Sequence, residues 1–253
     1  MNFGICKLAA IPMRSENSHK SEMVSQLLFG ECYSVLEKNG GWIKISTLDC
    51  NYEGWIQDEQ YFEISSTELK YIKTLNKLRV VEPIIQLNVN RETLFPMGAV
   101  ITNGDMIEDS ASVLSSKSLE DMTTEEKRCF LKKCAFKLLG TPYLWGGRTA
   151  FGIDCSGFTQ LLFSLIGITL PRDASQQVQQ GCVIDFVSEA ELGDLAFFKN
   201  DVGDVVHVGI LLGNSEIIHA SGEVRVDVVD ETGIFNRANN RYTHLLRVVK
   251  RIL

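Results

Sequence analysis

Residues 152–160 read GIDCSGFTQ, and this stretch decides how the second half of the chain folds. Apolar side chains follow it at helical spacing up to residue 166, and Gly167 closes the run, so we expect a helix over 155–166. Cys155 is then the first residue of that helix, and Asp154 is suited to cap it. Because unpaired N–H groups at a helix start stabilise a thiolate, the sequence predicts a lowered thiol pKa at Cys155.

The segments on either side complete an α+β pattern. Upstream, apolar residues recur at helical spacing from 130 to 139 after a start at Thr123 or Thr124, and Gly140 with Pro142 stops that helix. Downstream of Gly181 the pattern predicts strands at residues 194–198, 206–212, 216–220, 225–229 and 244–252. Helices followed by a run of strands predict helices packed on an antiparallel sheet.

The N-terminal part has a different pattern. Residues 1–63 hold short apolar or alternating segments separated by polar turns, which predict a small all-β barrel. Weaker strand patterns continue through residues 78–108, so the first domain, 1–110, holds either one barrel or a second, incomplete one from residue 66. A serine-rich linker is expected at 111–124, and the second domain is expected at 125–253.

Composition limits the classes of function. The chain has 253 residues and a formal net charge of −7, which is the wrong sign for a protein that binds nucleic acid or an anionic membrane surface. No apolar run approaches the length of a spanning helix, and no leader pattern opens the chain, although a leader removed earlier would leave no trace. Seven cysteines without a CxxC pair indicate free thiols, so we expect a cytoplasmic protein.

A cysteine nucleophile needs a base, and the chain has four histidines. His19 and His244 are expected to be surface or structural residues. His207 and His219 lie on neighbouring predicted strands joined by a tight turn, so they can be cross-strand neighbours. Gly209 shares the face of His207, and its missing side chain leaves room for a helix N-terminus to dock. The spacing is unlike that of zinc ligands, so neither a metal nor another cofactor is expected.

The ordered motifs GTPYLWGG, GIDCSGFTQ, LPRDASQQ, GDLAFF, HVGILLGN and IIHAS resemble the NlpC-type papain-like cysteine peptidases that cut cell-wall peptides, over about residues 126–250. The N-terminal motifs SEMVSQLLFGE and EGWIQ resemble a bacterial SH3-like domain. The two-part arrangement is similar to the γ-D-glutamyl-diamino acid endopeptidases of murein peptide recycling. That resemblance implies a papain-like α+β domain preceded by a small SH3-like barrel.

The resemblance also implies roles for individual residues. Cys155 would be the nucleophile, His207 the base and His219 the residue that orients the base, while the Tyr143 hydroxyl would help to hold the oxyanion. The implied substrate-binding residues are Asp154, Ser156, Glu22, Tyr52, Arg172, Asp173, Ser175 and Trp145.

The predicted function is hydrolysis of the γ-D-glutamyl-diamino acid bond, with meso-diaminopimelate or L-Lys as the diamino acid, in murein peptides with a free N-terminal L-Ala. That peptide is the expected partner. One alternative is a secreted peptidoglycan hydrolase in which the SH3-like domain tethers the enzyme to the wall. Others are a noncatalytic sensor of wall fragments and a transferase or amidase on the same scaffold.

Overall fold

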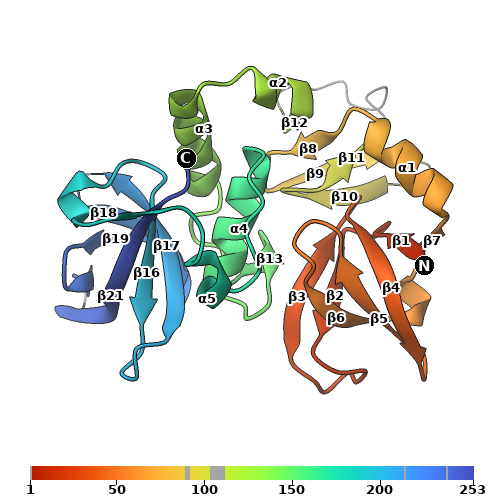
Figure 1. Cartoon of the computed structure of the whole chain (residues 1–253), viewed down its shortest axis with the longest axis horizontal. Helices are drawn as coiled ribbons and strands as arrows, with labels where there is room; N and C mark the ends of the chain where they lie inside the picture. The colour runs from red at the N-terminus through yellow and green to blue at the C-terminus, as the bar shows by residue number, and fades with distance from the viewer. Residues whose placement is uncertain (1, 89–91, 103–111, 214, 238) are drawn as a thin grey trace. The chain divides into compact units, whose positions relative to one another are not determined.

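The computed structural model describes residues 2–88, 92–102, 112–213, 215–237 and 239–253. The chain divides into two compact units. Unit 1 comprises Met1–Asp121 and Trp145–Ala150, and unit 2 comprises Met122–Leu144 and Phe151–Leu253. Figure 1 labels the elements of both. Within the described residues, no helix has the length and apolar character to cross a bilayer.

The main sheet of unit 1 is the small all-β domain expected from the sequence. Its strands are β1 (Phe3–Ile5), β2 (Ala10–Arg14), β3 (Met23–Leu28), β4 (Cys32–Asn39), β5 (Trp42–Thr47), β6 (Glu53–Gln57) and β7 (Glu63–Ile64). They pair antiparallel in the order β3-β2-β6-β5-β4-β1-β7. Gly40 and Gly41 join β4 to β5 at positive φ, a conformation that glycine adopts without strain in a tight hairpin.

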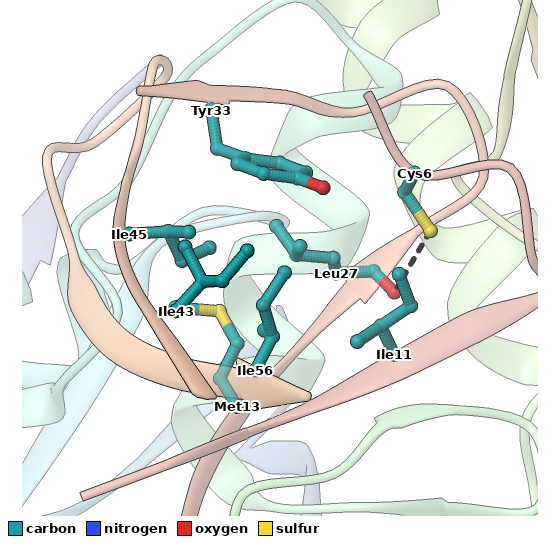
Figure 2. Packing of buried hydrophobic residues seen from close by; sticks show 8 residues of the cluster. All are labelled: Cys6, Ile11, Met13, Leu27, Tyr33, Ile43, Ile45 and Ile56. Atoms are coloured by element: carbon teal, nitrogen blue, oxygen red, sulfur yellow. Dashed lines mark hydrogen bonds between the residues drawn. The ribbon is translucent and has the colours of Figure 1, made fainter. Parts of the chain in front are cut away.

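Alternation along these strands builds the core of the sheet. Every second residue is buried in β2, and also in β5 from Ile43 onward, so one face of each strand points inward. Figure 2 shows the side chains that meet there. They are Cys6, Ile11, Met13, Leu27, Tyr33, Ile43, Ile45 and Ile56.

The rest of unit 1 has a separate small core. Its elements are η1 (Asp58–Gln60), α1 (Ser66–Thr74), β8 (Leu78–Val80), β9 (Ile84–Asn88), β10 (Glu92–Pro96), β11 (Val100–Ile101), β12 (Val113–Ser115) and α2 (Ser116–Glu120). Strands β8, β11 and β12 form one sheet, β9 and β10 form another, and Val80, Phe95, Ala99 and Ile101 pack together. The expected linker at 111–124 therefore contains a strand and a short helix; its residue 111 lies outside the described residues.

Three helices belong to unit 2: α3 (Thr124–Phe136), α4 (Cys155–Leu165) and α5 (Ala174–Gln177). Thr123 caps α3 in a capping box with Glu126, as the sequence indicates. The helix ends before the predicted stop at Gly140, because the N–H groups of residues 137–139 bond to carbonyls three residues back and tighten the last turn. Helix α4 packs against α3 and against the sheet of unit 2 (Figure 1).

The sheet of unit 2 closes on itself. Its strands are β15 (Cys182–Ile184), β16 (Leu195–Lys199), β17 (Val205–Gly213), β18 (Glu216–Ser221), β19 (Glu223–Val229), β20 (Gly233–Asn236) and β21 (Arg241–Arg251). All pairs are antiparallel in the order β15-β21-β16-β17-β18-β19-β20, and β20 also pairs with β21. Strands β16–β21 thus form a ring. Two short elements of unit 2 lie outside this sheet: β14 (Gly152–Ile153) and η4 (Val187–Glu189). Strands β15 and β20 and helix α5 were not predicted from the sequence.

A buried ion pair holds residues 145–150 within unit 1. Arg148, in the short strand β13 (Arg148–Thr149), donates to both carboxylate oxygens of Glu31, at 3.0 and 2.9 Å. Its Nη1 also donates to the backbone oxygen of Gln26 at 2.6 Å, and its backbone N–H donates to the Gln26 amide oxygen at 2.7 Å. The Arg148 side chain is 5% exposed, so these partners replace the water that its two terminal nitrogens lose on folding, while its buried Nε has no partner among the described residues.

We predict that Arg148→Ala destabilises unit 1 by about 3–5 kcal/mol, because the change leaves the Glu31 carboxylate buried without its cation. Lys44→Ala breaks the half-exposed Lys44–Glu53 pair and serves as the control, with an expected loss below about 1 kcal/mol. Urea unfolding followed by tryptophan fluorescence measures both, since the three tryptophans (42, 55 and 145) all belong to unit 1. Equal losses in the two variants would contradict the role of this pair.

Candidate active site

Cys155 stands at the start of α4, where the sequence analysis placed it. Asp154 has an extended backbone conformation, and its carboxylate accepts a hydrogen bond from the Gly157 N–H at 2.6 Å, so it is the N-cap. The Cys155 side chain is buried. The cap fixes the first turn of the helix and therefore the position of this thiol.

Arg172 holds the same cap from the other side. Its Nη1 lies 3.0 Å from Oδ1 of Asp154, and its Nη2 lies 2.5 Å from Oδ2. Nη1 also donates to the Ser156 hydroxyl at 2.9 Å. The two charged side chains are 6% and 2% exposed, so this is a buried bidentate ion pair. Asp154, Ser156 and Arg172 are thus parts of one network, and their predicted contacts with substrate stay a prediction.

The segment after Arg172 is tied to α4 by Gln177. Its side-chain nitrogen donates to the backbone oxygens of Ser156 and Pro171, at 3.0 and 2.9 Å. Its side-chain oxygen accepts from the Thr159 hydroxyl at 2.7 Å. The motif LPRDASQQ therefore packs against helix α4 and holds it in place. Of its other predicted site residues, Ser175 is exposed and Asp173 is half-buried.

The environment of the Cys155 thiol differs from the expectation. Burial, followed by the negative charge of Asp154, raises its pKa to about 11. Hydrogen bonds with the backbones of Val208 and Ser156 act in the opposite direction but are outweighed. The predicted lowering of this pKa was wrong, because the helix start that stabilises a thiolate is also removed from water. The thiol therefore needs a base at neutral pH.

A histidine pair lies on β17 and β18, next to the residue that contacts this thiol. Nε2 of His207 and Nδ1 of His219 are 2.9 Å apart and share a hydrogen bond, and both side chains are buried. A Cβ on Gly209 would come within 2.8 Å of the His219 Cβ and 2.7 Å of Ile217. The neighbouring strand therefore makes the close approach at Gly209 itself, while the start of α4 meets β17 at the adjacent residue, where Cys155 contacts the backbone of Val208.

Asp227 on β19 extends the pair, and the sequence analysis missed it. Its Oδ2 lies 3.1 Å from Nε2 of His219, and its Oδ1 accepts from Nη2 of Arg225 at 2.9 Å. Burial alone would raise the pKa of Asp227, but the hydrogen bonds from His219 and Arg225 outweigh burial and lower it. The signal was in the sequence: residues 219 and 227 face each other diagonally across the hairpin that turns at Gly222.

His244, expected to be a surface or structural residue, packs against the histidine pair. Its ring stacks on that of His207 with centroids 4.2 Å apart and planes at 26°, a contact that was not predicted. Both histidines lie next to a register shift in the sheet. The pairing of β16 with β17 shifts directly after the Phe198–His207 pair, and the pairing of β20 with β21 shifts directly after the Ile234–His244 pair. Simple alternation cannot foresee such bulges.

Tyr143 lies close to the thiol. Burial, and after it the charges of Cys155 and Asp154, raise the pKa of its phenol, so the hydroxyl stays protonated and can donate. Its backbone N–H donates to Gly222 at 2.8 Å, which fixes the segment in unit 2.

Three predicted substrate-binding residues belong to unit 1. The indole N–H of Trp145 donates to the Glu22 carboxylate, and both side chains are exposed. Tyr52 is half-buried and packs against the barrel core. Contact of these residues with substrate stays a prediction.

Comparison with protein families gives two matches. Residues 140–242 match the NlpC/P60 family, and residues 13–60 match the bacterial dipeptidyl-peptidase SH3 domain. The first match contains every residue of the cluster described above except His244, which follows its end.

Relatives cover most of the chain. A γ-D-glutamyl-L-lysine dipeptidyl-peptidase of Bacillus cereus is 27% identical over 81% of this chain and 68% of its own length. A dipeptidyl-peptidase 6 of Lysinibacillus sphaericus is 29% identical over 83% and 86%. A crystal structure of an NlpC/P60 family protein from Bacillus cereus ATCC 10987 superposes with a TM-score of 0.82 over 99% of both chains at 20% identity, which is a likeness of fold.

The neutral histidines predict a loss of stability in acid. Burial, and after it His219, lower the pKa of His244 from 6.5 to about 4; burial also holds the pKa of His207 well below 6.5. The unfolded chain therefore binds more protons below pH 6.5, so stability present above that pH is lost as the pH falls toward 4. Each histidine contributes a slope of at most about 1.4 kcal/mol per pH unit.

Urea unfolding of unit 2, followed by far-ultraviolet circular dichroism at pH 7.5 and pH 5, measures this loss. His244→Phe keeps a ring on His207 and should reduce the difference between the two pH values. Leu245→Ala, at an exposed neighbour on β21, should leave the difference unchanged. An identical pH dependence in wild type and His244→Phe would contradict the prediction.

Proposed function

We propose that this chain, a cysteine peptidase, hydrolyses the γ-D-glutamyl-diamino acid bond of murein peptides with a free N-terminal L-Ala. It carries an NlpC/P60 family domain at residues 140–242 and a bacterial SH3 domain at residues 13–60. The residue after the D-glutamate is L-Lys or meso-diaminopimelate. One observation carries the proposal: the buried Cys155 thiol contacts the backbone of Val208, directly beside the hydrogen-bonded histidine pair.

In the first half of the reaction, Cys155 is the nucleophile and His207 is the base. The thiol proton passes to His207 as the sulfur attacks the γ-carbonyl carbon of the D-glutamyl residue. The carbonyl oxygen gains the negative charge, which the Cys155 backbone N–H and the Tyr143 hydroxyl stabilise. When the tetrahedral intermediate collapses, the C–N bond breaks and the amine of the diamino acid leaves with the proton from His207. The dipeptide remains on sulfur as a thioester.

In the second half, water replaces the amine. His207 takes a proton from the water as its oxygen attacks the thioester carbonyl, and the C–S bond breaks. The products are L-Ala-D-Glu and the free thiol, to which His207 returns the proton. His219 holds the base in one orientation throughout, through the 2.9 Å hydrogen bond between the two rings.

The substrate assignment is supported by the names of the relatives. A dipeptidyl-peptidase removes two residues from a free N-terminus, and two such proteins align with most of this chain. In an intact stem peptide that nitrogen is an amide joined to the glycan, so the preferred substrates are released fragments. All seven cysteines are free, which favours a reducing compartment. We propose that the reaction belongs to the cytoplasmic recycling of murein peptides.

The base is expected to control how fast Cys155 reacts. With the thiol pKa near 11, little thiolate exists at pH 7.5 unless a neighbouring imidazole takes the proton. His207→Ala should therefore slow iodoacetamide labelling of Cys155 by at least about tenfold, without changing labelling of the exposed Cys182. Peptide mapping by mass spectrometry measures both sites. Equal labelling rates for Cys155 in wild type and variant would contradict the assignment of the base.

Substrate preference is tested with five substrates: L-Ala-γ-D-Glu-L-Lys, the same peptide with meso-diaminopimelate, the N-acetylated form of each, and intact sacculi. We expect release of L-Ala-D-Glu from the free peptides. A site that binds the free ammonium leaves its acceptor groups unpaired when the nitrogen is acetylated, at a cost of about 1–3 kcal/mol. Acetylation should then lower kcat/KM by about tenfold to a few hundredfold.

The control is Cys155→Ala, which should release no product from any substrate, as judged by mass spectrometry. Equal cleavage of free and acetylated peptides, or efficient digestion of sacculi, would overturn the dipeptidyl assignment. It would favour instead a secreted hydrolase that acts on the intact wall.

A further inference from the structure

The hydrogen-bonded line in unit 2 does not end at His219. Asp227 contacts the far nitrogen of that ring, 3.1 Å from Nε2, and its side chain is 8% exposed. Arg225 lies beside the carboxylate, with Nη2 donating to Oδ1 at 2.9 Å and Nε 2.7 Å from Oδ2. The triad implied by the sequence assigns no role to either residue.

The protons along this line follow from what each group can do. An ionised carboxylate only accepts hydrogen bonds, so Asp227 requires a proton on Nε2 of His219. The Nδ1 of a neutral His219 then carries a lone pair and accepts from His207, whose Nε2 must hold the proton. The remaining ring nitrogen of His207, Nδ1, is left with a free lone pair. That nitrogen is the one that can take the thiol proton.

We propose that Asp227 is a positioning residue: it sets the tautomers of His219 and His207 in series, so that Nδ1 of His207 is the basic atom. This inference depends on the proposed function for the part played by His207. After the thiol proton arrives, His207 is an imidazolium with protons on both nitrogens, and its Nε2–H still donates to His219. No hydrogen bond of the line has to reverse during the reaction.

Arg225 makes the carboxylate necessary. It pairs directly with His219 across β18 and β19, and its guanidinium can only donate hydrogen bonds. With Asp227 present, Arg225 donates to the carboxylate. Without Asp227, Nε2 of His219 loses its acceptor while the donors of Arg225 stay on the paired residue, which favours a lone pair on Nε2 of His219 and a proton on its Nδ1. His207 would then have to accept at Nε2 and carry its proton on Nδ1, which removes the base.

The tautomers can be observed directly. Long-range ¹H–¹⁵N spectra of histidine-labelled Cys155→Ala protein distinguish Nδ1-protonated from Nε2-protonated rings, and the chain has only four histidines to assign. We expect Nε2 to be protonated in both His207 and His219. Asp227→Leu in the same background should move the proton of both rings to Nδ1. Asp227→Asn should preserve the original tautomers, because the amide oxygen can still accept from His219 while Arg225 disfavours the reverse orientation.

Kinetics on the catalytically intact chain give the second readout. Asp227→Leu should lower kcat by about a hundredfold or more with little change in KM, and Asp227→Asn should lie between that variant and wild type. Raising the pH should not restore the kcat of Asp227→Leu, because in this variant the proton of the neutral His207 ring lies on the wrong nitrogen, and the ring is not held in its protonated, cationic form. Asp230→Asn is the matched control: that carboxylate accepts hydrogen bonds from Thr232, Gly233 and Tyr242, none of which is a histidine.

The outcomes separate the two proposals. Proton positions on Nδ1 of His207 or His219 in the Cys155→Ala protein would overturn the role of Asp227, and so would wild-type kcat in Asp227→Leu. Should Asp227→Leu fail to fold, the Cys155→Ala spectra still decide, with Asp227→Asn as the second variant. Failure of the wild-type chain to cleave any murein peptide would instead overturn the proposed function, and it would leave the tautomer measurement intact.

Discussion

The arrangement of the site depends on the buried ion pair between Asp154 and Arg172. Two charges removed from water are stable only when nearly all of their hydrogen-bonding capacity is used, and here the carboxylate meets the guanidinium and the Gly157 N–H while the guanidinium also meets Ser156. These bonds join the start of α4 to the segment that leads into α5. Because Cys155 is the residue after the cap, its sulfur has a fixed position before any substrate arrives, and no loop has to rearrange to present it.

The other half of the site comes from strands β17, β18, β19 and β21. His207 and His219 share a hydrogen bond, and His244 stacks on the first of them in a region largely removed from water. Desolvation keeps the imidazole of His207 uncharged, and it also keeps the Cys155 thiol protonated. In the proposed mechanism the site therefore rests as thiol and imidazole, and charge develops only when a substrate is attacked. Asp227 supplies the single negative charge at the far end of the line.

Much of this could be predicted from the sequence, for physical reasons. Asp154 indicates the start of α4, and the apolar periodicity with Gly167 indicates how far it extends. The pairing of His207 with His219 follows from the tight turn between their strands. Contacts between elements far apart in the chain carry no such local signal. The stack of His244 on His207 depends on bulges in β17 and β21, and the raised thiol pKa depends on how deeply tertiary packing buries the helix start. Helix α5 and strand β20 are too short for a periodicity to develop.

The central claim is that a thioester forms on Cys155, and rapid acid quenching during turnover of L-Ala-γ-D-Glu-L-Lys tests it most directly. Trypsin should release residues 149–172 as one peptide, which contains Cys155 and none of the other six cysteines. The account predicts that mass spectrometry will find this peptide carrying one L-Ala-D-Glu acyl group, and that His207→Ala will not accumulate it. Product formation with the peptide unmodified at every quench time, or with the acyl group on a different residue, would contradict the account.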